Sequence, residues 1–261
     1  MMAKLIEADT RLDAWMMSVE HLLNHDRVLN LTLAIDSPTR GGNNTTIDRF
    51  LAKEGKSSMH TVAETLFPAV EYTRRGLPGV LDFYPEEVYP AIEKHPSLLW
   101  GTYAYRLVRR RGAGGTVVNP LKQLIAKMQS EGTKAAAKTS CYELGVTEAE
   151  YDLPLYRTTK DGARRMGGPC LSHLSFKLFK GAVHLTAFYR SHDYRYKVPG
   201  NLLGLARLHA CVAREVGREI GSMVVHSSYA YLQGSKSRMR TLLSELRLSE
   251  ARREADSVVA H

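Results

Sequence analysis

The sequence predicts an α+β domain built around a β-sheet, and two patterns carry this prediction. Apolar residues recur at the three- and four-residue steps of an amphipathic helix in Thr10–Asn24 and in Asn201–Ile220. Two β-rich runs, Leu171–Phe179 and Ala182–Tyr189, are separated by a Lys-Gly turn and predict a hairpin. Because helices and strands follow in mixed order without a repeat or a low-complexity linker, we expect one domain over residues 1–261.

The composition is that of a chain with a full hydrophobic core. Of the 261 residues, 44% are apolar, which excludes disorder, collagen and coiled coil as descriptions of the whole chain. Three cysteines cannot form a disulfide framework and suit a reducing compartment. No apolar run reaches the ~18 residues of a membrane-spanning helix, and the N-terminal segment is too charged for a signal peptide. We therefore expect a cytoplasmic protein without a membrane partner.

The N-terminal half is predicted to contribute two helices and a strand. The strand Val28–Ile35 follows the helix over Thr10–Asn24, and the Pro, Gly and Asn content of Ser37–Thr46 predicts an exposed loop. A second helix is predicted over His60–Tyr72. Glu64 lies inside the apolar run of this helix, where an ionised carboxylate is costly unless it is paired or functional.

The second half is predicted to contain further helices and strands around the hairpin. A helix over Asn119–Gln129 has a proline in its first turn, where the missing N–H costs nothing. A strand over Ala135–Leu144 follows, and the polar stretch Gly145–Gly168 predicts a loop. After the hairpin and the long helix, a last strand over Ser222–Leu232 precedes a charged amphipathic helix over Ser237–Ala255.

The chain is basic, with 36 Lys and Arg against 27 Asp and Glu and a net charge of +9. Much of the excess lies between Tyr105 and Lys138. Such a field favours anionic partners, and nucleic acid, a membrane surface and phosphorylated small molecules all qualify. Charge alone does not choose among them.

Cys170 is the first candidate for chemistry, because it follows a Gly-Gly-Pro turn and opens a strand. A fixed backbone position suits a nucleophile, provided that a neighbouring group lowers the thiol pKa from ~8.5. The alternative is a small buried hydrophobe, since free cysteine is among the most buried residue types.

The segment after the second hairpin strand supports the functional interpretation. It groups Arg190, Ser191, Asp193 and Asn201 around a turn. Together these side chains can hold a phosphate, a carboxylate-dependent ligand and the edge of a base. The arginine can also stabilise the thiolate of Cys170. Without a cysteine on the neighbouring strand, a solvated basic turn would be the better interpretation.

These motifs resemble those of the thymidylate synthase and pyrimidine hydroxymethylase family. Pro169-Cys170, Arg190-Ser191-His192-Asp193 and Pro199-Gly200-Asn201 follow in the order and spacing of that family's nucleophile, phosphate and base-recognition motifs. Upstream, TVAETLFP and WGTYAYR place Glu64 and Tyr103 like the family's catalytic glutamate and its tyrosine near the reacting carbon. The resemblance is good over roughly a quarter of the chain and faint before it.

The resemblance implies a thymidylate synthase-like fold, with a mixed twisted sheet and a long buried helix surrounded by helices, and a homodimer packed through the sheet face. It also implies folate-dependent one-carbon transfer to C5 of a pyrimidine nucleoside 5′-monophosphate. Addition of the Cys170 thiolate at C6 makes C5 nucleophilic, and 5,10-methylenetetrahydrofolate supplies the electrophilic carbon. The product carries a methyl group, or a hydroxymethyl group where water reaches the intermediate first.

The resemblance assigns roles to individual residues. Glu64 would organise water and relay protons, Tyr103 would assist the removal of the C5 proton, and Asp193 would orient the folate. Arg190 and Ser191 would bind the phosphate.

Three further positions concern the substrate. Asn201 would hydrogen-bond the base, and its carboxamide suits a uracil edge, whereas relatives that take cytosine tend to carry Asp. The family's sugar-binding His and Tyr fall at Tyr229 and Tyr231, or at Tyr231 and Gln233 where the spacing from the asparagine is kept. The arginine pair that a partner subunit contributes to the phosphate aligns with Lys134-Ala135.

Other positions depart from the family pattern. The histidine directly after the nucleophile is Leu171 here, and the glutamine five positions after it is Ser175. The segment Gly234–His261 is shorter than the family's tail, which closes over the folate. Since the nucleophile, its arginine and the base-recognising asparagine are kept while their surroundings change, the sequence predicts a variant substrate or product.

The sequence is also compatible with two functions other than an enzyme. A nucleic-acid-binding protein on a degenerate fold would use a basic patch to follow phosphates, and a catalytically silent protein would keep the fold alone. A zinc site is disfavoured, because Cys170-x-x-His173 has no second pair at the required spacing. The basic patch consists of Arg106, Arg109, Arg110, Arg111, Lys122 and Lys127.

Overall fold

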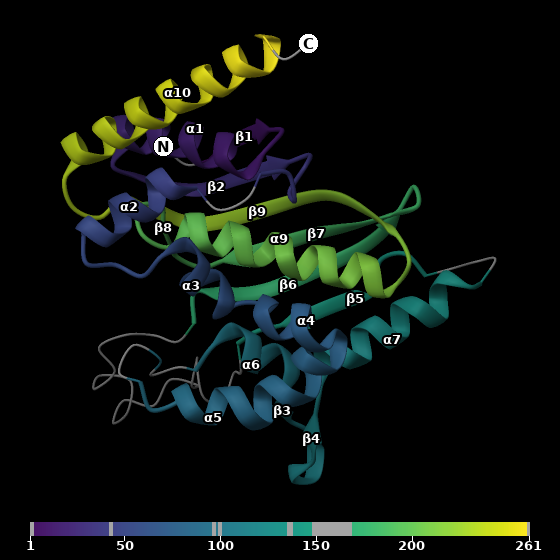
Figure 1. Ribbon diagram of the computed structural model, residues 1–261. Helices are drawn as coiled ribbons and strands as arrows, with labels where there is room; N and C mark the ends of the chain where they lie inside the picture. The colour runs from purple at the N-terminus through teal and green to yellow at the C-terminus, as the bar shows by residue number, and fades with distance from the viewer. Residues whose placement is uncertain are drawn as a thin grey trace.

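The computed structural model describes residues 3–41, 44–95, 98, 101–134, 138–147 and 169–259. Within them the chain forms an α+β fold with a mixed seven-stranded sheet, which confirms the predicted α+β class, while the thymidylate synthase-like topology stays a prediction (Figure 1). Six strands form the main sheet order, and the short strand β8 (His192–Asp193) pairs with β9 beside them. In spatial order the six are β1 (Lys4–Ala8), β2 (Arg27–Ile35), β9 (Glu219–Tyr231), β7 (Ala182–Tyr189), β6 (Leu171–Phe179) and β5 (Tyr142–Gly145).

The sheet combines parallel and antiparallel pairs. β1 runs parallel to β2, and both β7 and β8 run parallel to β9, while the other neighbours are antiparallel. The predicted hairpin is confirmed, because Phe179 of β6 pairs with Ala182 of β7. Lys180 and Gly181 between them both have positive φ, 49° and 81°, as a type I′ turn requires.

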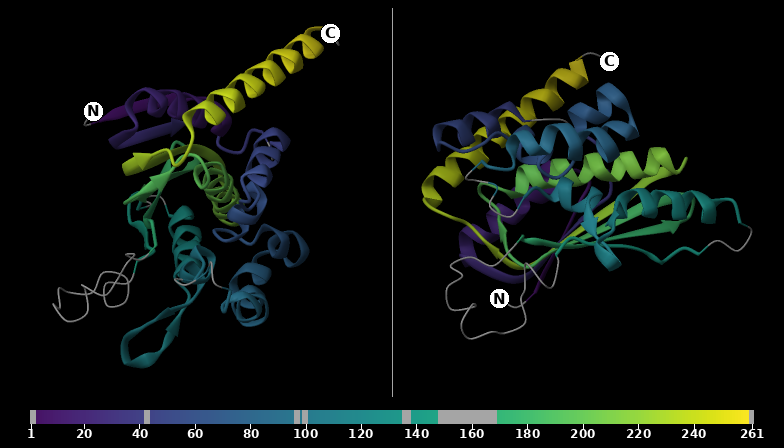
Figure 2. Two further views of the ribbon diagram at one scale, coloured as in Figure 1. Left: turned by 90° about the vertical axis from the view of Figure 1, so that its left-hand side faces the viewer. Right: turned by 90° about the horizontal axis from the view of Figure 1, so that it is seen from below.

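Helices gather on one face of the sheet (Figure 2). α9 (Val198–Glu215) packs on the central strands β7 and β9, α1 (Arg11–His25) packs on β1 and β2 at one edge, and α7 (Pro120–Gly132) packs on β5 at the other. Among the described residues, no helix has the length and the apolar character needed to cross a membrane. The other elements are α2 (Thr45–Lys53), α3 (Met59–Glu64), α4 (Ala69–Arg75), a π-helix (Gly79–Val88), α5 (Tyr89–Ile92), α6 (Tyr103–Val108), the paired strands β3 (Arg110–Arg111) and β4 (Val117–Val118), and α10 (Lys236–Val259).

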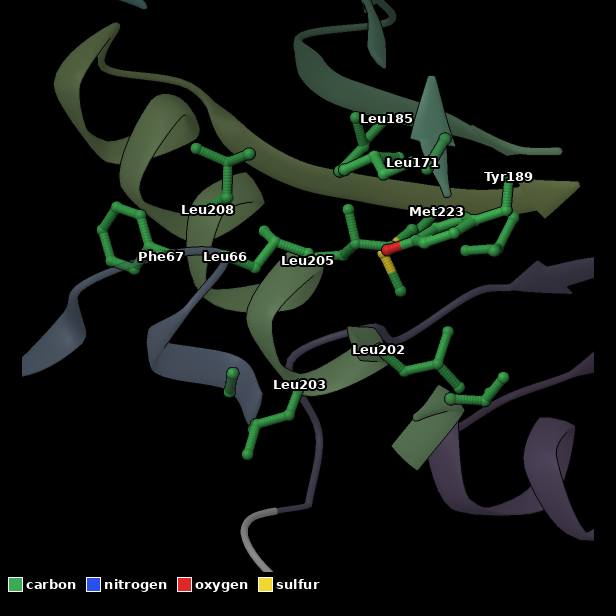
Figure 3. Packing of buried hydrophobic residues seen from close by; sticks show 14 of the residues in the cluster. Leu66, Phe67, Leu171, Leu185, Tyr189, Leu202, Leu203, Leu205, Leu208 and Met223 are labelled. Atoms are coloured by element: carbon green, nitrogen blue, oxygen red, sulfur yellow. The ribbon is translucent and has the colours of Figure 1, made fainter. Parts of the chain in front are cut away.

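The hydrophobic core lies between α9 and the sheet. Figure 3 shows Leu205 of α9 directed toward Met223 of β9, with Leu185 of β7 nearby. All three side chains are buried. Burial of one such side chain stabilises the fold by about 1.5–3 kcal/mol, so this layer holds the central helix firmly on the strands that carry the site.

The opposite face of the sheet carries half-buried and exposed side chains. His184, Thr186 and Phe188 of β7 lie on it, and so does His226 of β9. The rings of Phe188 and His226 stack with their centroids 5.0 Å apart. This is the face through which the expected homodimer would pack, and the oligomeric state stays a prediction.

The long helix differs from its predicted bounds, because a strand follows it sooner than expected. Instead of Asn201–Ile220, α9 spans Val198–Glu215. Pro199 occupies its first turn, where no N–H is needed. Gly217, with a φ of 63°, follows the end of the helix, and the chain enters β9 at Glu219.

The single helix predicted over His60–Tyr72 is wrong, because the chain forms two helices there, α3 and α4. Pro68 has no N–H and disfavours helical backbone in the residue before it, so the helix stops. α3 lies very close to α9: a Cβ on Gly200 would be 2.5 Å from Cβ of Val62, and one on Gly204 would also contact α3. Glycine is what allows this approach.

Several elements, β1 and α2 among them, are absent from the sequence predictions. α2 begins at the end of the predicted loop Ser37–Thr46, because the side chain of Asn44 accepts hydrogen bonds from the backbone N–H groups of Thr46 and Ile47 at 3.0 and 3.1 Å. This is an N-cap, which starts a helix inside a polar segment.

The strand predicted over Ala135–Leu144 is shorter in the structure, where β5 begins at Tyr142. Residues 135–137 of that prediction, and residues 148–168 of the predicted loop, lie outside the described residues. The predicted terminal helix is confirmed, because α10 begins at Lys236 and buries Met239 and Leu242.

Candidate functional site

Cys170 lies at the beginning of β6, and its backbone is fixed from two sides. Its carbonyl oxygen accepts a hydrogen bond of 2.9 Å from the backbone N–H of Arg190, at the end of β7. Its own N–H donates to the hydroxyl oxygen of Tyr103 at 3.2 Å, and the N–H of Leu171 donates to the same oxygen at 3.3 Å. The side chain of Cys170 is half-buried. The structure therefore brings the predicted nucleophile, arginine and tyrosine together.

Tyr103 is positioned by the start of α6, where the N–H of Ala104 donates to the carbonyl oxygen of Thr65 at 3.0 Å. Burial, followed by the proximity of Cys170, raises the pKa of Tyr103 to about 12, although Arg190 acts in the opposite direction. The hydroxyl therefore stays protonated at neutral pH.

Arg190 and Ser191 lie between β7 and β8, beside the cysteine. The guanidinium Nε of Arg190 donates to the carbonyl oxygen of Pro169 at 3.1 Å, which ties the end of β7 to the residue before the cysteine. The side chains of Ser191 and Gln233 lie close enough to the hydroxyl of Tyr231 to lower its pKa. Burial, and then the charge of Asp193, raise the pKa of Tyr231.

Asp193 is buried at the end of β8. Burial raises the pKa of its carboxyl group against the effect of three backbone N–H groups, those of Arg195, Tyr196 and Gln233. Its Oδ1 accepts a hydrogen bond of 3.0 Å from the backbone N–H of Arg195. The role toward folate that the family resemblance implies for this residue stays a prediction.

Asn201 lies in the first turn of α9 and is buried. Its amide Nδ2 is 3.0 Å from Nε2 of His192. Since an amide nitrogen only donates, Nε2 is the acceptor and the ring proton is on Nδ1, which lies 3.1 Å from the hydroxyl oxygen of Ser227. Burial lowers the pKa of His192 to about 3, so the ring is neutral at physiological pH.

Two aromatic rings pack against His192. The Tyr189 ring stacks on it with centroids 3.8 Å apart and an interplanar angle of 9°, and the Tyr194 ring meets it edge-on at 5.5 Å. The hydroxyl of Tyr194 is 3.0 Å from that of Ser227, which closes the network. The orientation of the Asn201 amide is therefore set by groups behind it.

The structure does not bring Glu64 and Lys134 into contact with Cys170. Oε1 of Glu64 accepts a hydrogen bond of 3.1 Å from Arg207 on α9, and its Oε2 accepts one of 3.3 Å from the backbone N–H of Val70. Lys134 forms an ion pair of 2.6 Å with Glu131 at the end of α7. Their proposed roles stay predictions.

Tyr229 is linked to the residues around Cys170 by Tyr231, its neighbour on β9. Its ring centroid is 5.6 Å from that of Tyr231, whose hydroxyl lies near Ser191. Of the two predicted sugar-binding residues, Tyr231 has the direct connection.

The sequence did not predict the residues that orient the amide of Asn201. These are His192, Ser227 and the rings of Tyr189 and Tyr194. The aromatic spacing in FYRSHDYRY is visible in the sequence. What the sequence does not reveal is that β9 pairs with both β7 and β8. Ser227 is opposite Tyr189 of β7 and Ala230 is opposite His192 of β8, so the histidine lies beside Ser227.

Other predicted features can be located as well. Several cations of the basic patch bind carbonyl oxygens of the chain itself, such as Arg106 to Val146 at 3.5 Å and Lys127 to Cys141 at 3.0 Å. In the described part of the chain, no group of three or more His, Cys, Asp or Glu side chains is arranged to hold a metal ion.

Comparison with known proteins gives a partial similarity to thymidylate synthases. No family model matches the chain. Curated proteins named "Putative thymidylate synthase" match over 64 residues, with 39% identity for Methanosarcina barkeri, 42% for Methanosarcina acetivorans and 41% for Methanothermobacter marburgensis. The match covers 24% of this chain and 29–30% of the relatives' own length. A thymidylate synthase-like relationship therefore holds over about a quarter of the chain.

Proposed function

We propose that this protein is a thymidylate synthase-like enzyme that transfers a one-carbon unit to C5 of a pyrimidine nucleoside 5′-monophosphate. The proposal rests on one observation: the backbone of Cys170 forms hydrogen bonds with the hydroxyl of Tyr103 and with the backbone of Arg190. Ser191 and Tyr231 lie beside them. The names of the partial relatives support the same class of reaction.

The cysteine would begin the reaction by adding its thiolate to C6 of the base. This addition breaks the conjugation of the ring and makes C5 a nucleophile. Arg190, on the neighbouring strand, would favour the thiolate and bind the 5′-phosphate together with Ser191. The folate 5,10-methylenetetrahydrofolate would supply the electrophilic carbon, with Asp193 accepting a hydrogen bond from it.

Tyr103 and Glu64 would serve the proton transfers that follow. Since the pKa of Tyr103 is about 12, its hydroxyl carries a proton at neutral pH and would pass it along a relay instead of acting as the first base. The Tyr103 oxygen already accepts two N–H groups, so its O–H can donate toward the base. Glu64 would act through water, because its described partners are Arg207, His60 and the N–H of Val70.

Asn201 would select the base. With one Nδ2 hydrogen held by His192, the amide keeps Oδ1 and the second hydrogen for the ligand. A uracil edge offers N3–H to the oxygen and O4 to the hydrogen, whereas cytosine offers the reverse pattern and requires the amide to turn over. The neutral histidine therefore favours uracil over cytosine.

Tyr229 and Tyr231 would contact the sugar, and Lys134 of a second subunit would replace part of the arginine pair at the phosphate. We propose that two chains pack through the uncovered sheet face that carries Phe188 and His226. The nucleic-acid alternative has no described contact in its favour, because cations of the basic patch already bind carbonyl oxygens.

The proposal is tested by mass spectrometry after incubation with UMP, dUMP, CMP or dCMP and methylenetetrahydrofolate. We expect a uracil nucleotide heavier by a methyl or a hydroxymethyl group, and a covalent protein adduct that is lost in Cys170→Ser. Cys141→Ser, which removes another half-buried thiol, is the matched control and should keep both. Unchanged nucleotides with every substrate and no adduct would overturn the proposal.

Base selection is tested with His192→Phe, which keeps a ring against Tyr189 but removes the acceptor for Asn201. Loss of one hydrogen bond is worth about a factor of ten. We expect the ratio of kcat/KM for uracil over cytosine nucleotides to fall by about that factor. An unchanged ratio in a folded, active variant would contradict the role of the histidine.

A further inference from the structure

A buried guanidinium at the start of α1 lacks an acidic partner. Arg11 is only 7% exposed, and its described hydrogen bond goes from Nη2 to the carbonyl oxygen of Gly41. Its Nε is buried without a hydrogen-bond partner among the described residues. No carboxylate of those residues forms an ion pair with it, since Asp9 binds Arg40 and Glu64 binds Arg207. A buried charge in this state is costly to the fold.

A second guanidinium increases that cost. Arg207 on α9 is close enough that its charge, after the larger effect of burial, lowers the pKa of Arg11 to about 10. At neutral pH Arg11 still carries its charge. Two positive groups therefore lie near each other, and one carboxylate, that of Glu64, neutralises only the second.

The space beside these two groups is open. A surface hollow of about 420 Å³ is lined by Arg11, Arg207, Thr39, Gly41, Leu203 and Ala206, among others. A second hollow of about 210 Å³ adjoins Arg11 and includes apolar side chains. A volume of a few hundred Å³ is that of a site for a small molecule.

We infer that Arg11 and Arg207 form a binding site for an oxyanion, the phosphate or carboxylate group of a small molecule, between α1 and α9. A guanidinium presents parallel N–H groups that match both kinds of oxyanion. The N-terminus of α1 adds its dipole to the attraction. Leu203 and Ala206 provide apolar contact for the rest of the ligand.

This site is separate from that of Cys170. Asn201, Leu205 and the network of His192 lie on the side of α9 that faces the sheet. Figure 3 shows Leu203, which lines the hollow, on the opposite side of the helix from Leu205. Arg207 also pairs with Glu64 of the proposed proton relay, so the inference is tested through Arg11, which has no part in the proposed reaction.

The test is the binding of inorganic phosphate and of acetate to the full chain, measured by calorimetry and by thermal unfolding in solutions of equal ionic strength, with chloride as the reference. We expect saturable binding of at least one oxyanion, and affinity weaker by about tenfold or more in Arg11→Met, since a charge-assisted hydrogen bond is lost. Preference between the two anions identifies the ligand group.

Three variants distinguish binding at this site from a general effect of positive charge and from binding at the cysteine. Arg247→Met removes an exposed charge on α10 and should leave binding unchanged. Arg190→Met removes the cation at the proposed nucleotide site. The oxyanion binding that Arg11→Met weakens should still be measurable in this variant. Arg11→Lys keeps the charge but loses the paired N–H groups, so intermediate affinity is expected. Absence of saturable binding in the wild type, or equal binding in Arg11→Met, would overturn the inference.

Discussion

Two arginines are buried among the described residues; the Nε of each lacks a hydrogen-bond partner, but only one of them pairs with a carboxylate. Arg195 is 1% exposed, and its Nη2 forms an ion pair of 2.9 Å with Glu54, while its Nη1 donates to the carbonyl oxygen of Ser235. Arg11 has a single described hydrogen bond, to a carbonyl oxygen, and no carboxylate. The fold thus supplies a carboxylate for one buried guanidinium and leaves the other for a ligand.

The carboxylate of Glu54 also shows why the first pair is structural. It accepts hydrogen bonds from the hydroxyl of Tyr196 at 2.9 Å and from Arg238 at 2.7 Å. One side chain at the end of α2 therefore binds the turn before α9 and the beginning of α10. Removal of Glu54 would release three elements at once, whereas Arg11 joins only α1 to the loop at Gly41.

The largest expected effect is that of Glu54→Ala, which leaves Arg195 buried without its partner. Breaking a buried pair in this way costs about 3–5 kcal/mol of the free energy of unfolding. Urea unfolding measures the loss. Glu20→Ala removes the exposed partner of Arg247 and should cost less than about 1 kcal/mol. Equal losses in the two variants would contradict the distinction between the buried and the exposed pair.

Acid should weaken the Glu54 network in a defined range of pH. Arg238, with Tyr196 and Arg195, lowers the pKa of Glu54 from 4.5 to about 2. Because the folded pKa lies below the unfolded one, this stabilisation is fully present above about pH 4.5 and is lost as the pH falls toward 2. Glu54→Gln should lose less stability than the wild type over that interval, as measured by urea unfolding at each pH.

The smallest effect is expected for Arg11→Met in chloride buffer without phosphate or carboxylate. Removal of an uncompensated buried charge relieves its desolvation cost, so the free energy of unfolding should change by less than about 1 kcal/mol or rise. Thermal and urea unfolding check this value. A loss as large as that of Glu54→Ala would show that Arg11 is a structural residue like Arg195.

The sequence predicted the parts of the fold that depend on local pattern. The hairpin of β6 and β7 and the helix α1 have a clear apolar period, and both are confirmed, as is the terminal helix α10. The sequence prediction was wrong where a single residue determines the local structure. Pro68 divides the predicted helix, and Asn44 begins α2 inside a polar loop. In β1 only Ile6 is buried, so the sequence has no alternation of apolar and polar residues that would predict the strand.

The candidate site was predictable where its residues are consecutive in motifs. Cys170, Tyr103, Arg190 and Ser191 belong to short motifs and are brought together by the fold. The partners of Asn201 could not be predicted, because His192 meets Ser227 through the pairing of β9 with both β7 and β8. The same limit applies to Arg11, whose lack of a carboxylate is a property of its neighbours in space.

The glycines of α9 constrain how the site can respond to a ligand. Because Gly200 and Gly204 leave no room for a Cβ against α3, the two helices touch almost backbone to backbone and behave as a rigid unit. Asn201 lies within this unit and cannot slide along α3. Adjustment to nucleotides of different size must therefore come from rotation of side chains and from the turn between β7 and β8, while the base-facing amide keeps a constant place.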